Sequence, residues 1–237
     1  QEWLAHHSVA QRERARIRFQ VTPAGAPASE EQRVRRVAEH EFRVMSRLQH
    51  DGILRPKDLV QSELGVGLTY DYDESWQRLD LWVAEQTHGM PLATQLSIVR
   101  QVGEALQYAH ANKVVHRALT PRSVWVRPVP GTRGDVKVRV GGWEGAGILN
   151  PADLTRTAVP GVTALHDADG PAGNDTEEGG FGAPEGQWSP TADRARIDVF
   201  GLGALAFYVL SSRAPASGRG ELTQRLHTQD GLDLAVE

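Results

Sequence analysis

Residues 116–126 read HRALTPRSVWV, and this stretch decides the fold. It follows a long segment at 92–112 and the pair Val114-Val115, and it ends in the apolar triplet Val124-Trp125-Val126. Apolar residues recur at helical spacing in the long segment, which predicts a helix, and the pair and the triplet predict short strands. The residues between them are therefore expected to form a polar turn that joins two strands behind a long helix.

The sequence on either side alternates between strand and helix patterns. Strands are predicted at 14–21, around Val60, around Leu68 and at 136–140. Helices are predicted at 30–49, 79–85, 197–210 and 220–228. Residues 150–180 are rich in Gly, Asp, Pro, Thr and Ala, which favours a long surface loop. We therefore expect a mixed first region and a mainly helical second region.

Composition limits the class of function. The 237 residues are 40% hydrophobic and carry a net charge of −4, so they can bury a large core but present no basic footprint for nucleic acid. There is no cysteine, which excludes disulfides, thiolate metal sites and cysteine nucleophiles. No stretch reaches the ~20 apolar residues of a membrane span, and the first twenty residues are too polar for a signal peptide. We expect a cytoplasmic protein with neither a nucleic-acid nor a membrane partner.

Four motifs, taken in order, resemble those of the protein kinase family. HRALTPRSVWV is similar to the catalytic loop, H-R-D-L-K-P-x-N followed by three apolar residues. Glu41, nine residues before His50, resembles the regulatory-helix glutamate. Ala183-Pro184-Glu185 and Asp198-Val199-Phe200-Gly201 resemble the end of the activation segment and the start of the buried central helix. One such motif is weak evidence, but four in the right order and spacing are strong.

The resemblance covers nearly the whole chain, from roughly the third kinase strand to just past the buried helix. It implies an α+β, two-lobed fold, with residues 1–73 as a small mixed N-lobe and 74–237 as a mainly helical C-lobe. Residues 1–11 contain no glycine for the loop that covers the phosphates in kinases, and few residues follow the buried helix. We therefore expect an incomplete N-lobe and a C-lobe truncated after that helix.

The resemblance also shows what the catalytic positions contain. The proton-accepting aspartate is Ala118, the following lysine is Thr120, and the metal-binding asparagine is Ser123. Gly142 stands where the family's D-F-G motif carries its metal-binding aspartate. Phosphoryl transfer depends on these charges, so no intact catalytic residue is expected. The residues expected to keep structural roles are His116, Arg117, Trp143, Glu185 and Asp198, of which Asp198 would brace the catalytic loop.

The nucleotide pocket has candidates of its own. Arg18 falls at the third-strand lysine and would pair with Glu41, either beside a phosphate or only as a structural salt bridge. Trp125 falls beneath the adenine position. Its indole either fills the pocket, or it turns outward into a partner surface or packs between the two lobes. Tyr70 falls at the gatekeeper. Glu144, assisted by Ser123, is the alternative metal ligand; otherwise no metal is expected.

These positions predict a pseudokinase that acts as a regulatory or scaffolding module, with no cofactor. Its expected partner is a protein, either an active kinase or another domain of the same polypeptide. The alternative is a weak or atypical ATP- and Mg²⁺-dependent serine/threonine kinase, or another phosphoryl or nucleotidyl transferase, that uses Glu144 and Ser123. A third interpretation is a switch that binds ATP without turnover through Arg18 and Glu41.

Overall fold

The computed structural model describes residues 2–6, 14–20, 27–62, 65–86, 89–148, 180–184 and 194–228. The loop predicted at 150–180 lies outside these residues except for Gly180, and so does Glu185. Over the part that is described, no helix combines the length and apolar character that a membrane span requires.

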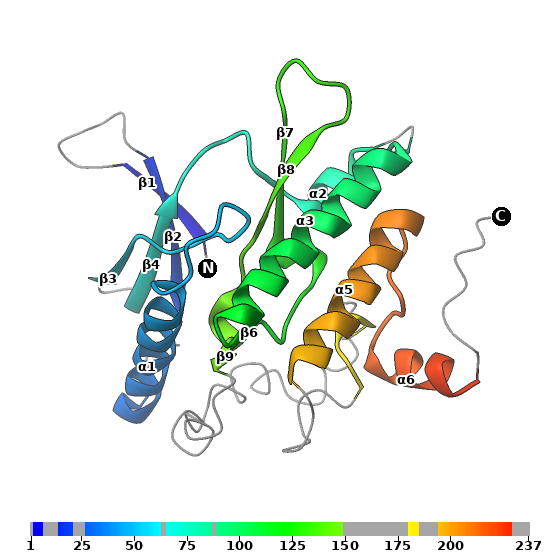
Figure 1. The fold of residues 1–237 in the computed structure, drawn as a ribbon. Helices are drawn as coiled ribbons and strands as arrows, with labels where there is room; N and C mark the ends of the chain where they lie inside the picture. The colour runs from blue at the N-terminus through cyan, green and yellow to red at the C-terminus, as the bar shows by residue number, and fades with distance from the viewer. Residues whose placement is uncertain are drawn as a thin grey trace.

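A four-stranded antiparallel sheet forms one side of the molecule (Figure 1). Its strands are β1 (Glu2–His6), β2 (Arg14–Gln20), β3 (Asp58–Ser62) and β4 (Gly65–Asp71), in the order β1-β2-β4-β3. The predictions for β2, β3 and β4 are confirmed. Strand β1 was not predicted, because its five residues show no clear alternation and its place is set by pairing with β2, Trp3 opposite Ile17. The sheet therefore holds one strand more than the sequence pattern indicated.

Helix α1 (Ala28–Met45) packs against this sheet. Its buried apolar residues, Val34, Val37, Ala38, Val44 and Met45, recur at helical spacing along one side. The helix ends four residues before the predicted limit of 49, since the Ser46 hydroxyl donates to the Arg43 carbonyl and competes with further helical bonding. Glu41 is buried on the inner side of α1, which aims its carboxylate at the sheet.

A second sheet lies in the middle of the molecule, with strand order β5-β7-β8. Its strands are β5 (Gln77–Arg78), β7 (Val124–Pro128) and β8 (Val136–Val140). The valines of β7 and β8 are buried on one face, and the residues between them point to the other. Ile53, in the loop after α1, makes a parallel bridge with Val140, and this bridge ties the first half of the chain to the second.

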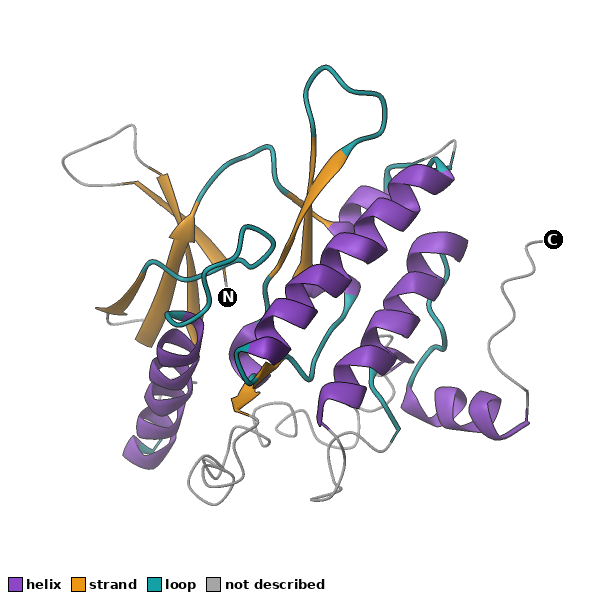
Figure 2. Cartoon of the chain, viewed as in Figure 1, coloured by secondary structure: helices purple, strands orange, loops and turns teal. Residues whose placement is uncertain are grey.

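The remaining described elements are helical except for one small sheet (Figure 2). The helices are α2 (Leu79–Ala84), α3 (Leu92–Ala111), α5 (Arg194–Ser211) and α6 (Arg219–Thr228). The small sheet pairs β6 (Val114–Val115) with β9 (Gly147–Ile148). Helix α3 lies between β8 and α5, and its inner residues join the main hydrophobic core. The predicted helices are confirmed with small shifts at their ends.

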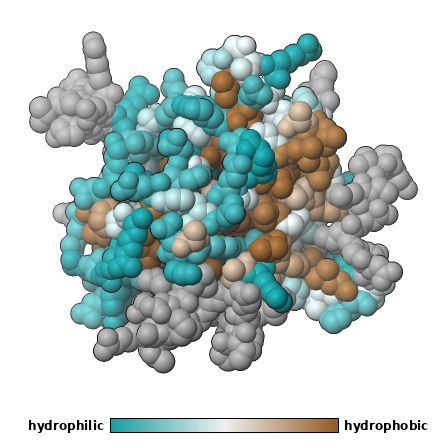
Figure 3. Space-filling model, in the orientation of Figure 1, coloured by the Kyte–Doolittle hydropathy of each residue, from teal (hydrophilic) through white to brown (hydrophobic). Residues whose placement is uncertain are grey.

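The architecture is thus the α+β arrangement expected, with a sheet-rich first region beside a mainly helical second region (Figure 1). Figure 3, in the same orientation, shows hydrophilic residues over the first region and a hydrophobic area over the helical one. The polar turn predicted between Val115 and Val124 lies after β6, and its last part, the 3-10 turn Pro121–Ser123, leads into β7. This turn faces the space between the two regions, where the candidate site lies.

Candidate functional site

The turn after β6 is held from behind by Asp198 at the start of α5. The backbone N–H groups of His116 and Arg117 donate to its two carboxylate oxygens at 2.8 and 2.6 Å, and His110 Nε2 lies 2.7 Å from Oδ2. Arg117 has a φ of 72°, the left-handed region that few side chains adopt without support. The structure therefore places Asp198 in the bracing position that the sequence suggested.

The charge of Asp198 is supported by these donors. Burial opposes ionisation, but the hydrogen bond from His110, the charge of His116 and the two backbone N–H groups outweigh it and keep the pKa of Asp198 below its ordinary value. The group is 1% exposed, so an ionised carboxylate there depends on every one of these contacts. Asp198 and its three donors, from His110, His116 and Arg117, therefore form a polar cluster whose members depend on one another.

His116 and Trp143 form the packed base of the site. His116 is fully buried and its Nε2 lies 2.8 Å from the carbonyl of Gly141. The indole N–H of Trp143 donates to the Val140 carbonyl at 2.9 Å, and its ring meets the His116 ring edge-on, with the centroids 4.5 Å apart. This contact holds the turn after β6 against the turn after β8.

Ala118, Thr120, Ser123 and Gly142 all line one cavity of about 250 Å³ between the two regions. The four positions singled out from the sequence are therefore neighbours in space. Ser123 is engaged locally, since its hydroxyl donates to the Thr120 carbonyl at 2.8 Å and accepts from the Thr120 N–H at 3.0 Å. Such a capping box fixes the 3-10 turn that starts β7.

Gly142 adopts a backbone conformation that resists any other residue. Its φ is 73°, and a Cβ atom added there would lie only 2.9 Å from the Ser123 Cβ. A carboxylate side chain at this position would need both a strained backbone and a displaced neighbour. The local backbone therefore accommodates glycine and leaves no room for a side chain at position 142.

Arg18 joins two carboxylates at the back of the cavity. One guanidinium nitrogen pairs with Glu41 of α1, and the other donates to Glu144 Oε2 at 2.8 Å. The Tyr70 hydroxyl donates to the second oxygen of Glu41 at 3.3 Å. The expected pairing of Arg18 with Glu41 is thus present, with Glu144 as an added partner, and Arg18 also lines the cavity.

The ionisation of this cluster reflects its burial. Burial opposes the charge of Arg18, but Glu41 and Glu144 outweigh it and raise the pKa of Arg18 above its ordinary value. Burial raises the pKa of Glu41 to about 7, in spite of the opposing attraction of Arg18. One arginine therefore serves two carboxylates, of which the buried one is the more costly to ionise.

Arg16 was not singled out from the sequence, yet it faces Trp125 across the cavity. The Arg16 guanidinium carbon lies 3.9 Å from the centre of the Trp125 ring, a direct cation–π contact between β2 and β7. A planar ring inserted between them would need two contact distances, roughly 7 Å. Trp125 therefore lines the cavity and packs against Arg16 between the two regions. The alternation of RARIRF was the available signal, because it sets Arg16 and Arg18 on the same face of β2.

The donor set does not fit a magnesium ion. Among the residues that line the cavity, Glu144 is the single carboxylate, and Arg18 already holds it. Within the described ranges, no three His, Asp or Glu residues gather in a way that could hold a metal. Mg²⁺ prefers carboxylate oxygens with near-octahedral geometry, so Glu144 with the hydroxyl of Ser123 is a poor substitute.

Comparison with known proteins gives the family. Residues 9–140, more than half of the chain, match the model of the protein tyrosine and serine/threonine kinase family. The chain therefore belongs to the protein kinase family, which confirms the resemblance drawn from the four motifs.

Three curated relatives illustrate the match. The chain is 32% identical to "Probable kinase PglW" of Streptomyces coelicolor over 98% of its own length and 15% of that protein. It is 29% identical to serine/threonine-protein kinase PkaA of the same organism, over 78% of the chain and 30% of PkaA. It is 30% identical to serine/threonine-protein kinase PknA of Mycobacterium tuberculosis, over 77% of the chain and 38% of PknA. The chain thus spans well under half of each relative's length.

Proposed function

We propose that this protein kinase domain does not transfer phosphate and acts as a regulatory or scaffolding module. The observation that carries the proposal is the chemistry of the cavity wall. A methyl group, two hydroxyls and a hydrogen stand at Ala118, Thr120, Ser123 and Gly142. Phosphoryl transfer requires a carboxylate to accept the substrate proton, charged metal ligands and cations on the phosphates, and none of these four groups carries a charge.

The Arg16–Trp125 stack supports the proposal independently. Loss of catalytic groups alone would leave a cleft able to bind a nucleotide, but here two side chains of the chain itself meet at 3.9 Å between β2 and β7. Both residues line the same cavity as the four altered positions. The Arg16–Trp125 contact therefore occupies part of the cleft between β2 and β7, and we assign the cleft a structural role.

We assign the module a protein partner, either an active kinase or another domain of the same polypeptide. PglW, PkaA and PknA are each much longer than the aligned segment, so in those proteins a kinase-like segment is joined to further chain. A domain without turnover contributes to such a protein through the surfaces it presents. The weak-kinase and nucleotide-switch interpretations become outcomes of the experiments described below.

Phosphotransfer from γ-labelled ATP in Mg²⁺ or Mn²⁺, to the chain itself or to a generic basic protein, is expected to match the enzyme-free background. Removing one catalytic group already costs several powers of ten in an enzyme that uses it, and three kinds of group are altered here. The matched control is Glu144→Gln, which removes the only carboxylate that the described residues contribute to the cavity wall. Metal-dependent incorporation that disappears in Glu144→Gln would overturn the proposal and establish the weak-kinase alternative.

A further inference from the structure

We propose that a groove on the face of β7 and β8 that carries Arg127, Lys137 and Arg139, beside the cleft, binds an acidic peptide segment that carries a neighbouring apolar residue. The β7–β8 groove is a hollow of about 330 Å³ whose wall includes Asp51, Trp76, Glu104, Arg127, Lys137 and Arg139. The inference goes beyond the proposed function, because it names a surface and a ligand class and holds whether or not the cleft binds a nucleotide.

The register of the two strands creates the positive face. Trp125 lies opposite Arg139, and Arg127 lies opposite Lys137. Cross-strand partners project on the same side of a sheet, so these four side chains share the outer face while the valines fill the core. Like charges placed directly opposite each other are unfavourable unless a counter-charge lies near. The face is therefore chemically suited to a negatively charged ligand.

Trp76 organises the cations on this face. Its ring lies 4.9 Å from the guanidinium carbon of Arg127 and 4.6 Å from that of Arg139. Arg127 is also paired with Asp73 at 2.9 Å, and this contact uses its charge. Arg139 donates only to the backbone carbonyl of Asp51, at 3.3 Å. Trp76 thus positions two arginines: Arg127, whose charge Asp73 balances, and Arg139, whose charge is not balanced by a carboxylate of the described residues.

Lys137 supplies the second free charge. It is exposed, and neither it nor Arg139 forms an ion pair with any residue in the described part of the chain. The two cations are two residues apart on one strand, hence on the same face and about 7 Å apart along it. Two carboxylates of an extended peptide at alternate positions have the same spacing.

Two carboxylates that also line the groove affect the orientation of the ligand. Glu104 is paired with Arg100 of the same helix at 2.5 Å, so its charge is balanced. Asp51 is exposed and stands at the edge of the groove. Repulsion from Asp51 directs an acidic side chain toward Lys137 and Arg139.

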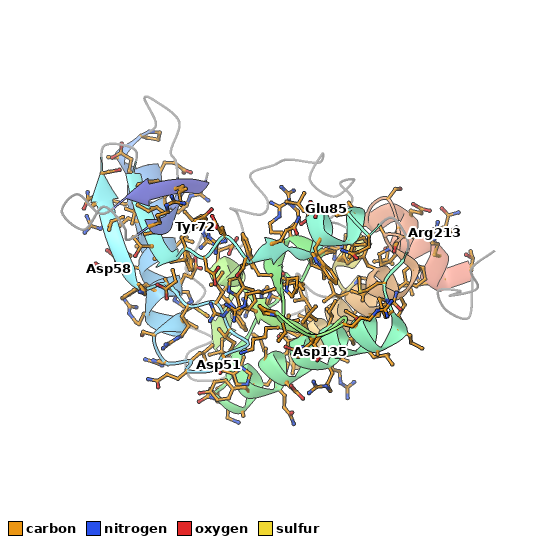
Figure 4. All side chains as sticks on the ribbon, turned by 90° about the horizontal axis from the view of Figure 1, so that it is seen from above. Asp51, Asp58, Tyr72, Glu85, Asp135 and Arg213 are labelled. Carbon is orange, nitrogen blue, oxygen red and sulfur yellow. The ribbon has the colours of Figure 1, made fainter. Side chains whose placement is uncertain are left out.

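An adjoining hollow of about 240 Å³ is the reason that we expect the ligand to carry an apolar residue next to its carboxylates. It shares Trp76 and Arg139 with the first hollow, and Leu54, Tyr72 and Trp125 contribute apolar surface to its wall. The rest of the wall is Arg16, Asp71 and Asp73, of which Asp71 pairs with Lys57 and Asp73 with Arg127. Figure 4 labels Asp51, which lines the first hollow, and Tyr72, which lines the second. A peptide that places carboxylates on Lys137 and Arg139 can bury the next aromatic or aliphatic side chain in this second hollow.

The test uses fluorescein-labelled peptides and anisotropy at low ionic strength. One peptide carries four glutamates followed by phenylalanine, and in two others glutamine or lysine replaces every glutamate. We expect saturable binding of the glutamate peptide alone, weakened by added salt. Lys137→Glu is expected to weaken it roughly tenfold, since it replaces a charged contact by repulsion. The matched control is Lys113→Glu, another exposed lysine, after α3 and outside the groove.

Three results would overturn the inference. They are equal binding of the glutamate and glutamine peptides, no saturable binding of the glutamate peptide at millimolar protein, and equal weakening by Lys113→Glu and Lys137→Glu. None of these readouts involves ATP, so failure here is distinguishable from failure of the proposed function.

Discussion

Replacing Asp198 with alanine is expected to lower the free energy of unfolding at pH 7 by about 3–5 kcal/mol, which is much of the stability of an ordinary domain. The change removes the acceptor for the N–H groups of His116 and Arg117 and for His110, all within 3 Å. Buried donors without a partner are costly, and Arg117 loses the support for its positive φ. Urea unfolding followed by circular dichroism measures the difference.

The deficit of Asp198→Ala should shrink in acid. Because the pKa of Asp198 is lowered in the folded state, its contribution is present above the unfolded pKa, near 4, and is lost as the pH falls through the folded value. Asp198→Asn, which keeps one acceptor, should cost less than Asp198→Ala. The exposed Asp51→Ala should stay within about 0.5 kcal/mol of the parent protein. An equal loss of unfolding free energy in Asp198→Ala and Asp51→Ala would show that the contacts of Asp198 do not stabilise the fold.

Opening the cleft is expected to create nucleotide binding that we do not expect of the parent chain. The double change Arg16→Ala with Trp125→Leu removes the 3.9 Å stack and leaves a gap between β2 and β7. If ATP is present at ten times its dissociation constant, mass action stabilises the variant by about 1.4 kcal/mol. For a chain of this size that raises the melting midpoint by roughly 3–5 °C relative to the same variant without ATP.

A matched control removes a second tryptophan–arginine contact from outside the cleft. Arg139→Ala with Trp76→Leu deletes the 4.6 Å stack on the outer face of β8 and should leave the response to ATP unchanged. The melting midpoint of each variant with ATP is compared with the midpoint of the same variant without ATP, so a general loss of stability does not affect the comparison. If the Arg16 and Trp125 variant shows no response while remaining folded, the stack is not what keeps nucleotide out.

The fold was predictable because its decisive residues are local in sequence. The turn between Val115 and Val124 and the buried helix α5 each have a distinct pattern, and their order restricts the fold to one family. Strand β1 escaped prediction because five residues without alternation acquire their structure only by pairing with β2. Patterns within a segment are visible in a sequence, whereas pairing between segments is not.

The same distinction separates the predicted and unpredicted parts of the site. Ala118, Thr120, Ser123 and Gly142 could be placed from motif positions, and the structure gathers them around one cavity. The contacts of Arg16 with Trp125 and of Arg18 with Glu144 join residues more than 100 positions apart. These contacts decide whether the cleft is open and whether Glu144 is available to a metal. Only the folded chain contains that information.

The measurement that tests the central claim most directly is the melting midpoint of the unaltered chain with and without millimolar ATP, first in EDTA and then in excess magnesium. A ligand that binds only the folded state raises the midpoint by mass action. The account predicts no shift in either buffer, because Arg16 and Trp125 close the cleft and Arg18 holds Glu144. A rise that requires magnesium would contradict it in favour of a metal-dependent enzyme, and a rise in EDTA would contradict it in favour of a metal-free nucleotide switch.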